Sequence, residues 1–170
     1  MRGLDLTTCQ TSAAALLPPV EYDVSKLPPA VQRRRAQIIQ AAASGELNQL
    51  RPVFEANGGP PQLSCEDLDD PIDCLRSLSG DQKGPEIPAD LLSALEAGFV
   101  HVEVGTPEEM YVWPYFAMYP LDKLTPAQLV ELFKLLTAAD VADMSAYCEY
   151  PFYRVGIGPE GTWKYFVGPQ

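Results

Sequence analysis

Residues 150–167 read YPFYRVGIGPEGTWKYFV, and this stretch predicts a β-hairpin near the end of the chain. Apolar and aromatic side chains alternate with other residues on both sides of a central turn, as they do in two paired strands. Tyr153, Val155 and Ile157 share one face of the first strand. Residues 158–161 (GPEG) have the composition of a type I turn with glycine at the left-handed position. Because an isolated hairpin is only marginally stable, we expect it to pack on helices or on a third strand.

The residues before the hairpin predict a series of short helices. Most begin at proline in the first turn or at a side chain that caps free N–H groups. The start signals are clearest at Asp70-Pro71 and at Thr125 and Thr137, which both open capping boxes. The expected helices span about 29–43, 46–56, 71–79, 88–97, 126–136 and 138–147, with one further helical turn at 106–109.

Residues 99–104 predict one more strand. Valine occurs at every second position, while His101 and Glu103 lie on the opposite face, as in a half-buried strand. With the hairpin, this strand gives an antiparallel sheet of two or three strands. We therefore expect an α+β fold, made predominantly of short helices with a small antiparallel sheet that ends in the C-terminal β-hairpin.

The chain divides into an N-terminal arm and one domain. Residues 1–28 lack helical or strand periodicity and are interpreted as an arm or the remnant of a leader. Residues 29–170 are interpreted as a single α+β domain. The sequence contains no run of 18 apolar residues, so we expect no insertion into a membrane.

The charge of the chain restricts its partners. It has 12 basic and 23 acidic residues, a formal net charge of −11. Nucleic acids and anionic membrane surfaces are disfavoured, because lysine and arginine are needed to neutralise their phosphates. The one basic cluster, Arg33-Arg34-Arg35, is interpreted as the solvated face of a helix. The expected partner is a protein or a small molecule.

No familiar catalytic motif is present. A Ser-His-Asp or Cys-His site would have to use His101, the one histidine, and no G-x-S-x-G sequence accompanies it. Phosphate-binding glycine motifs and zinc-type cysteine spacing are also missing. We therefore expect neither a cofactor nor a metal. A small hydrolase- or isomerase-like enzyme with a pocket around His101 is kept as the alternative.

The aromatic segment, residues 111–119, reads YVWPYFAMY. Aromatic side chains with polar tips, held by prolines, can line a ligand pocket or form an interaction surface, but they can also fill a core. Arg154 is the candidate for a group that recognises an anion, although a salt bridge to an acidic residue is the alternative. The other residues predicted to line such a pocket are Tyr111, Trp113, Tyr115 and His101.

The four cysteines lie at positions 9, 65, 74 and 148. Cys65 and Cys74 bracket a short acidic segment and are predicted to form a local disulfide if the protein is exported. The alternative is that the thiols are free, with Cys74 and Cys148 packed as small apolar residues.

Three passages carry a further signal: residues 70–72 (DPI) with 77–80 (SLSG), residues 105–116 (GTPEEMYVWPYF), and residues 152–167. Together they resemble a family of small, uncharacterised bacterial proteins, over about residues 20–168. Several members have export signals, so the resemblance implies a periplasmic or secreted protein, with a cytoplasmic one as the alternative. It implies no catalytic residue. With the aromatic segment and the lack of catalytic motifs, it favours a non-enzymatic exported binding module that uses residues 111–119.

Overall fold

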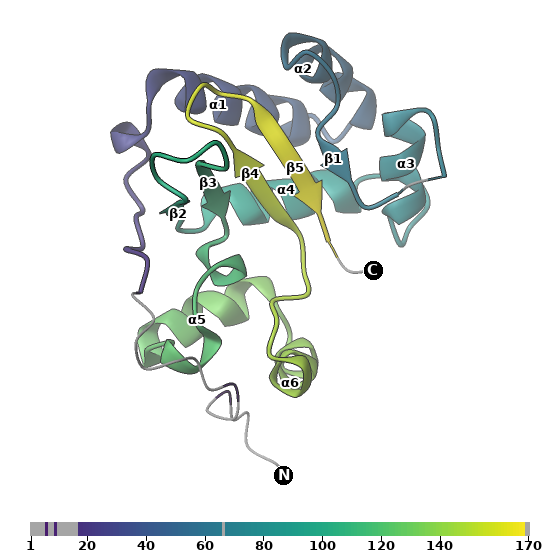
Figure 1. Ribbon diagram of the computed structural model, residues 1–170. Helices are drawn as coiled ribbons and strands as arrows, with labels where there is room; N and C mark the ends of the chain where they lie inside the picture. Colours follow the sequence, from purple (N-terminus) through teal and green to yellow (C-terminus); the bar gives the residue numbers. More distant parts are fainter. Residues whose placement is uncertain (1–5, 7–8, 10–16, 66, 169–170) are drawn as a thin grey trace.

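The computed structural model describes residues 6, 9, 17–65 and 67–168. The centre of this part of the chain is a five-stranded sheet with the strand order β1-β5-β4-β3-β2 (Figure 1). β1 runs parallel to β5, and the other neighbours are antiparallel. The strands are β1 (Gln62–Leu63), β2 (Val100–Val102), β3 (Met110–Trp113), β4 (Arg154–Ile157) and β5 (Trp163–Val167).

Strands β4 and β5 form the predicted C-terminal hairpin. Gly161 ends its turn with φ +89°, in the left-handed region that favours glycine. The Gly161 N–H donates a hydrogen bond to the Gly158 carbonyl at 2.9 Å. β3 pairs with the other side of β4, with Trp113 opposite Val155. The hairpin therefore lies within the sheet and is stabilised by neighbours on both sides.

The α+β class is confirmed, but the sheet is larger than expected and is mixed, not purely antiparallel. Two strands were not predicted. β1 has only two residues, which is too short to show alternation. β3 has Tyr111, Val112 and Trp113 all buried, so side chains on both of its faces are covered. A strand that is buried on both faces gives a continuous apolar run, not an alternating pattern.

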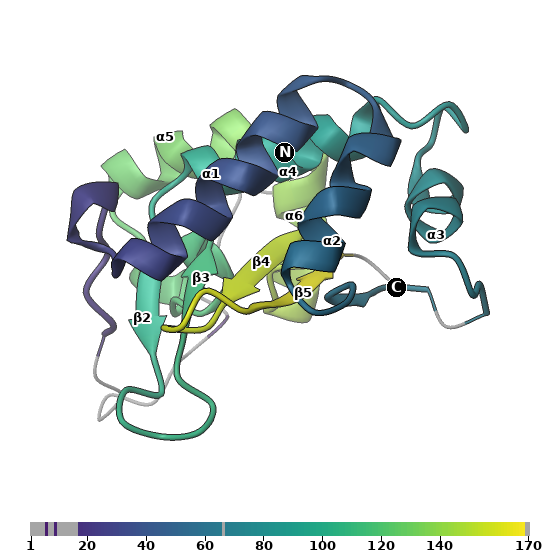
Figure 2. The same ribbon diagram turned by 90° about the horizontal axis from the view of Figure 1, so that it is seen from above.

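One face of the sheet is covered by helices that enclose the first hydrophobic core. Helices α1 (Pro29–Ala43), α2 (Arg51–Ala56) and α4 (Glu86–Glu96) lie on this face, and α3 (Pro71–Leu78) lies beside β1 (Figures 1 and 2). A 3-10 helix (Leu47–Leu50) precedes α2, and Pro52 stands in the first turn of α2. The sheet contributes Trp113, Val155, Ile157, Trp163 and Phe166 to this core, and the helices contribute Val31, Ile38, Leu50, Leu91 and Leu95.

A second core lies at the other side of the sheet, where α5 (Pro126–Leu135) and α6 (Ala138–Tyr147) pack. Both predicted capping boxes are confirmed, at Thr125 and Thr137. Between β3 and α5 the chain makes two 3-10 turns, Tyr115–Ala117 and Leu121–Lys123. The buried members of this core include Val100, Val112, Tyr115, Phe116, Leu132, Val141, Met144 and Tyr150.

Two local predictions are confirmed only in part. Residues 106–109 make one hydrogen-bonded turn, in which the Glu109 N–H donates to the Thr106 carbonyl oxygen at 3.1 Å, but no helix follows. The capping box is not formed, because the Glu109 carboxylate accepts a hydrogen bond from the Gly105 N–H at 3.2 Å and contacts His101. Of the predicted solvated arginine face, Arg33 is exposed, but Arg34 and Arg35 are half-buried. Arg34 donates hydrogen bonds to the carbonyl oxygens of Gly161, Val53 and Ala56, and Arg35 donates to that of Leu95. These two arginines tie α1 to neighbouring elements.

The described part of the N-terminal arm lies along the domain. Glu21 forms an antiparallel bridge with Phe99, and a 3-10 turn follows at Val24–Lys26. Leu27 is buried in the first core, and Leu6 is buried in the second. Within the residues that the structure describes, no helix has the length and apolar character needed to cross a membrane.

Candidate functional site

The five residues predicted to bind a ligand lie in several separate places. His101 and Tyr111 stand opposite each other on β2 and β3. Trp113 is buried in the first core, and Tyr115 is buried in the second. Arg154 lies at the start of β4, beside the end of α6. They do not form one pocket.

His101 is held by two side chains. Its ring stacks on Tyr111, with 4.2 Å between the centroids and 12° between the planes. Its Nε2 lies 2.7 Å from Oε1 of Glu109, and this hydrogen bond is the main reason that the pKa of Glu109 is lowered. Among the described residues, these side-chain partners of His101 include no serine, threonine or cysteine. The pair orients the imidazole but does not add a nucleophile of the kind that hydrolases use.

Residues 111–116 of the aromatic segment are buried, as expected for the core alternative. Trp113 has no exposed surface and packs on Phe99, with 5.1 Å between the ring centroids. Its Nε1 is buried without a hydrogen-bond partner among the described residues. The end of the segment is different, because Met118 is 43% exposed and Tyr119 is half-buried. Only this end is available to a ligand on the surface.

Tyr115 belongs to a small hydrogen-bonded cluster. Its hydroxyl and that of Tyr22 both donate to Oε2 of Glu131 on α5, the second at 2.9 Å. Burial, and then the hydrogen bond with Glu131, raise the pKa of Tyr115. Gly98 leaves room for the two rings, since a Cβ there would lie 2.8 Å from Cε1 of Tyr22. The cluster attaches the N-terminal arm to α5.

Arg154 is the one predicted residue with free hydrogen-bond donors in a hollow. Its Nη2 donates to the Tyr150 carbonyl oxygen, and its guanidinium carbon lies 5.8 Å from the centroid of the Tyr150 ring. Its Nε and Nη1 have no partner among the described residues and are not buried. No carboxylate in the described part of the chain forms an ion pair with it. The salt-bridge alternative for Arg154 is therefore wrong.

Two hollows meet at Arg154. The larger, which we name the α6 cleft, has a volume of about 850 Å³ and lies between α6 and the end of β5. The smaller, which we name the aromatic hollow, has a volume of about 350 Å³. Both volumes suit a small ligand or a short peptide. The α6 cleft is lined by Asp143, Tyr147, Glu149, Phe152, Arg154 and Val167, among others. The aromatic hollow is lined by Phe116, Tyr119, Leu121, Cys148, Tyr150 and Arg154, among others.

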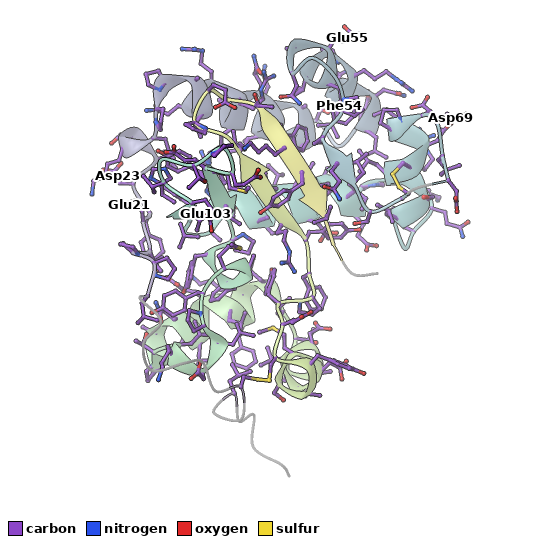
Figure 3. The ribbon with its side chains drawn as sticks, in the orientation of Figure 1. Glu21, Asp23, Phe54, Glu55, Asp69 and Glu103 are labelled. Atoms are coloured by element: carbon purple, nitrogen blue, oxygen red, sulfur yellow. A yellow bond between two sulfur atoms is a disulfide. The ribbon has the colours of Figure 1, made fainter. Side chains whose placement is uncertain are left out.

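The cysteines form two disulfides, one beside α3 and one beside α6 (Figure 3). Cys65 is joined to Cys74, with 5.9 Å between their Cα atoms. Cys9 is joined to Cys148, with 5.2 Å between their Cα atoms, and this pair was not predicted. Cys148 ends α6 in the left-handed conformation, with φ +57°. Its disulfide forms part of the wall of the aromatic hollow.

The described residues were also searched for side chains that could bind a metal ion. No group of three or more His, Cys, Asp or Glu side chains there is arranged to hold a metal ion. The chemistry available at Arg154 is instead recognition of an anion, because a guanidinium presents N–H groups that match a carboxylate or phosphate.

No family model, curated protein or solved structure matches the chain. Its function therefore has to be inferred from the geometry above.

Sequence reasoning selected Arg154 but did not include the neighbouring Tyr147 and Phe152 among the predicted site residues. Tyr147 follows Val141 and Met144 at helical spacing, yet it is the last residue of α6 and is 80% exposed. Phe152 lies between α6 and β4, in a connection without periodicity. The usable signal was the concentration of aromatic side chains in residues 147–153, next to the arginine.

Proposed function

We propose that the protein is a non-enzymatic binding module whose ligand contacts Arg154 and the exposed end of the aromatic segment. The observation that carries this proposal is the state of the Arg154 guanidinium. Two of its nitrogens are free, it forms no ion pair with a carboxylate of the described residues, and it lies where two hollows meet. An arginine that is oriented but unpaired is prepared to bind an anionic group from outside.

The role of the aromatic segment in this proposal is limited to its end. Phe116, Ala117 and Tyr119 line the aromatic hollow, whereas Tyr111 and Trp113 support the sheet from within. Tyr119 and Phe152 provide apolar surface on either side of Arg154. A ligand with an anionic group and an apolar part fits this combination.

Export of the protein, as a member of a bacterial family of periplasmic or secreted proteins, belongs to the same proposal. It is supported by the two disulfides, because such bonds persist in oxidising compartments.

The binding proposal is tested by adding small probes to ¹⁵N-labelled protein and following its NMR spectrum. The probes are benzoate, benzylamine and benzyl alcohol. We expect benzoate to shift the amide signals of Tyr147, Phe152 and Gly168, and Arg154→Gln to abolish these shifts. Arg33→Gln is the matched control, since Arg33 is exposed on α1 and its loss changes the net charge equally. The proposal is wrong if no probe shifts signals in the two hollows.

The alternative is a small hydrolase- or isomerase-like enzyme centred on His101. The 2.7 Å contact with Glu109 favours it, because a carboxylate can orient an imidazole for proton transfer. In that case His101→Gln would abolish turnover of a panel of chromogenic esters, while Arg154→Gln would leave it unchanged. We expect no turnover that depends on His101.

A further inference from the structure

The charges around Arg154 are of both signs. Arg154 lies where the two hollows meet, while Glu149 lines both hollows and Asp143 lines the α6 cleft. Asp143 and Glu149 are exposed, and neither forms an ion pair with a described residue. The whole chain has a net charge of −11. A purely anionic ligand would therefore be repelled at long range, although Arg154 would attract it at short range.

The two hollows also differ in character. The aromatic hollow is small, and it offers little apolar surface because Phe116 and Leu121 in its wall are almost fully buried. The α6 cleft is larger and combines its acidic residues with Tyr147 and Phe152. A ligand whose anionic group lies at Arg154 can therefore place an apolar group in the α6 cleft, beside Tyr147 and Phe152.

We propose that the ligand is a peptide whose C-terminal carboxylate binds Arg154 and which carries a basic residue before an apolar last residue. The last side chain packs on Tyr147 and Phe152 in the α6 cleft. The preceding residues follow the α6 cleft, where the basic side chain meets Asp143 and Glu149. This inference rests on the proposed binding function and adds the chemical class of the ligand.

The charge pattern supports a peptide of this kind over a simple carboxylate. A positively charged ligand is attracted by the acidic molecule as a whole, which raises its association rate. At short range, the C-terminal carboxylate of the peptide can then bind the Arg154 guanidinium, although the surrounding residues are acidic. A ligand without the basic group lacks the attraction, and a ligand without the carboxylate leaves the donors of Arg154 unpaired.

The test uses the peptide acetyl-Gly-Lys-Phe with a free carboxylate and measures its dissociation constant by calorimetry at low salt. The first comparison peptide is the C-terminal amide, and the second has norleucine in place of lysine. We expect the amide to bind at least about tenfold more weakly, since a charge-assisted hydrogen bond is lost. We expect the norleucine peptide to bind about threefold to tenfold more weakly.

Variants identify the groups responsible. In Arg154→Gln, the peptide with the free carboxylate should bind as weakly as the peptide amide. The affinity of the amide itself should not change. Asp143→Asn with Glu149→Gln should remove the preference for lysine over norleucine. Arg33→Gln should change neither preference, and thermal unfolding of each variant checks that it is folded. Arg154→Lys keeps the charge and should retain only part of the affinity, because it lacks the planar fork of donors.

The outcomes separate the two proposals. If benzoate binds in the hollows but the acid, amide and norleucine peptides bind equally, the peptide inference is overturned and the binding function stands. If neither benzoate nor any peptide binds there, both are overturned. If the peptide with the free carboxylate binds more tightly than the other two peptides, and this difference in affinity is lost in Arg154→Gln, the inference is supported.

Discussion

Asp90 is a partly buried carboxylate on α4, the helix that supports β4. Burial, and then the nearby Glu86 carboxylate, raise the pKa of Asp90 to about 6. An aspartate in the unfolded chain titrates near its ordinary value of 3.8. The folded state therefore binds this proton more tightly, and the contribution of Asp90 to stability decreases as the pH rises from about 4 to about 6.

We expect Asp90→Asn to stabilise the protein at neutral pH. The gain in the free energy of unfolding is about 1–2 kcal/mol after allowance for the exposed part of the side chain. The gain should decrease as the pH falls and vanish below about pH 3, because Asp90 is then protonated in both states. Urea unfolding at several pH values measures both effects. Asp69→Asn, at an exposed position, is the control, and equal pH dependence of Asp90→Asn and the unaltered protein would contradict the assignment.

Individual residues differ in how far the sequence reveals their roles. Arg154 could be selected because it stands in a strand between aromatic residues. Its freedom from ion pairs could not be predicted, since that depends on which of the 23 acidic residues fold close to it. Trp113 shows the opposite case. Its aromatic neighbours suggested a pocket, but the strand that contains it is covered on both faces.

At the scale of elements, the turn of the hairpin also fixes the hairpin to α1. Gly161 has φ +89°, and a Cβ at this position would lie 2.7 Å from the Ala30 carbonyl oxygen. The Gly161 carbonyl accepts a hydrogen bond from Nε of Arg34 at 2.8 Å. Both the backbone conformation and the close approach therefore require glycine.

We expect Gly161→Ala to destabilise the protein by about 2–4 kcal/mol, through the left-handed conformation and the clash with α1. Gly58→Ala is the matched control. Gly58 has φ +83°, but a Cβ there meets nothing within 4 Å. This control should lose only about 1–2 kcal/mol, the cost of the backbone conformation alone. Chemical denaturation compares the two, and equal losses would show that the contact with Ala30 has no effect.

The elements that the sequence predicts best are those with a local signal. Asp70, Thr125 and Thr137 each cap a helix as expected, because a cap is made by residues close in sequence. β1 and β3 could not be predicted, since their pairing depends on β5 and β4, which follow much later in the chain. The hollows at Arg154 were hidden for the same reason, because α6, β5 and residues 116–121 meet only in the folded molecule.

At the scale of the whole molecule, the two disulfides close loops of very different length. The Cys9–Cys148 bond spans 139 residues, and the Cys65–Cys74 bond spans 9. A cross-link stabilises mainly by restricting the unfolded chain, and the effect grows with the length of the loop. The longer loop also joins the N-terminal arm to the wall of the aromatic hollow.

We expect replacement of Cys9 and Cys148 by alanine to lower the free energy of unfolding by up to about 5 kcal/mol. Replacement of Cys65 and Cys74 should lower it by up to about 2.5 kcal/mol. Denaturant unfolding without reducing agent measures both losses. Alkylation followed by mass spectrometry should find no free thiol in the native protein, and an equal or reversed order of the two losses would contradict the loop-length explanation.

The same long covalent loop determines how the molecule responds to mechanical force. Tension applied to the two ends of the chain passes from Cys9 to Cys148 through the sulfur atoms, so the residues between them carry no load. At about 3.5 Å per extended residue, the 139-residue span corresponds to roughly 490 Å of contour length, which cannot extend while the disulfide is intact. In a pulling experiment the oxidised protein can yield only by peeling β4 and β5 from the sheet. The helices and β3 can be drawn out only after reduction.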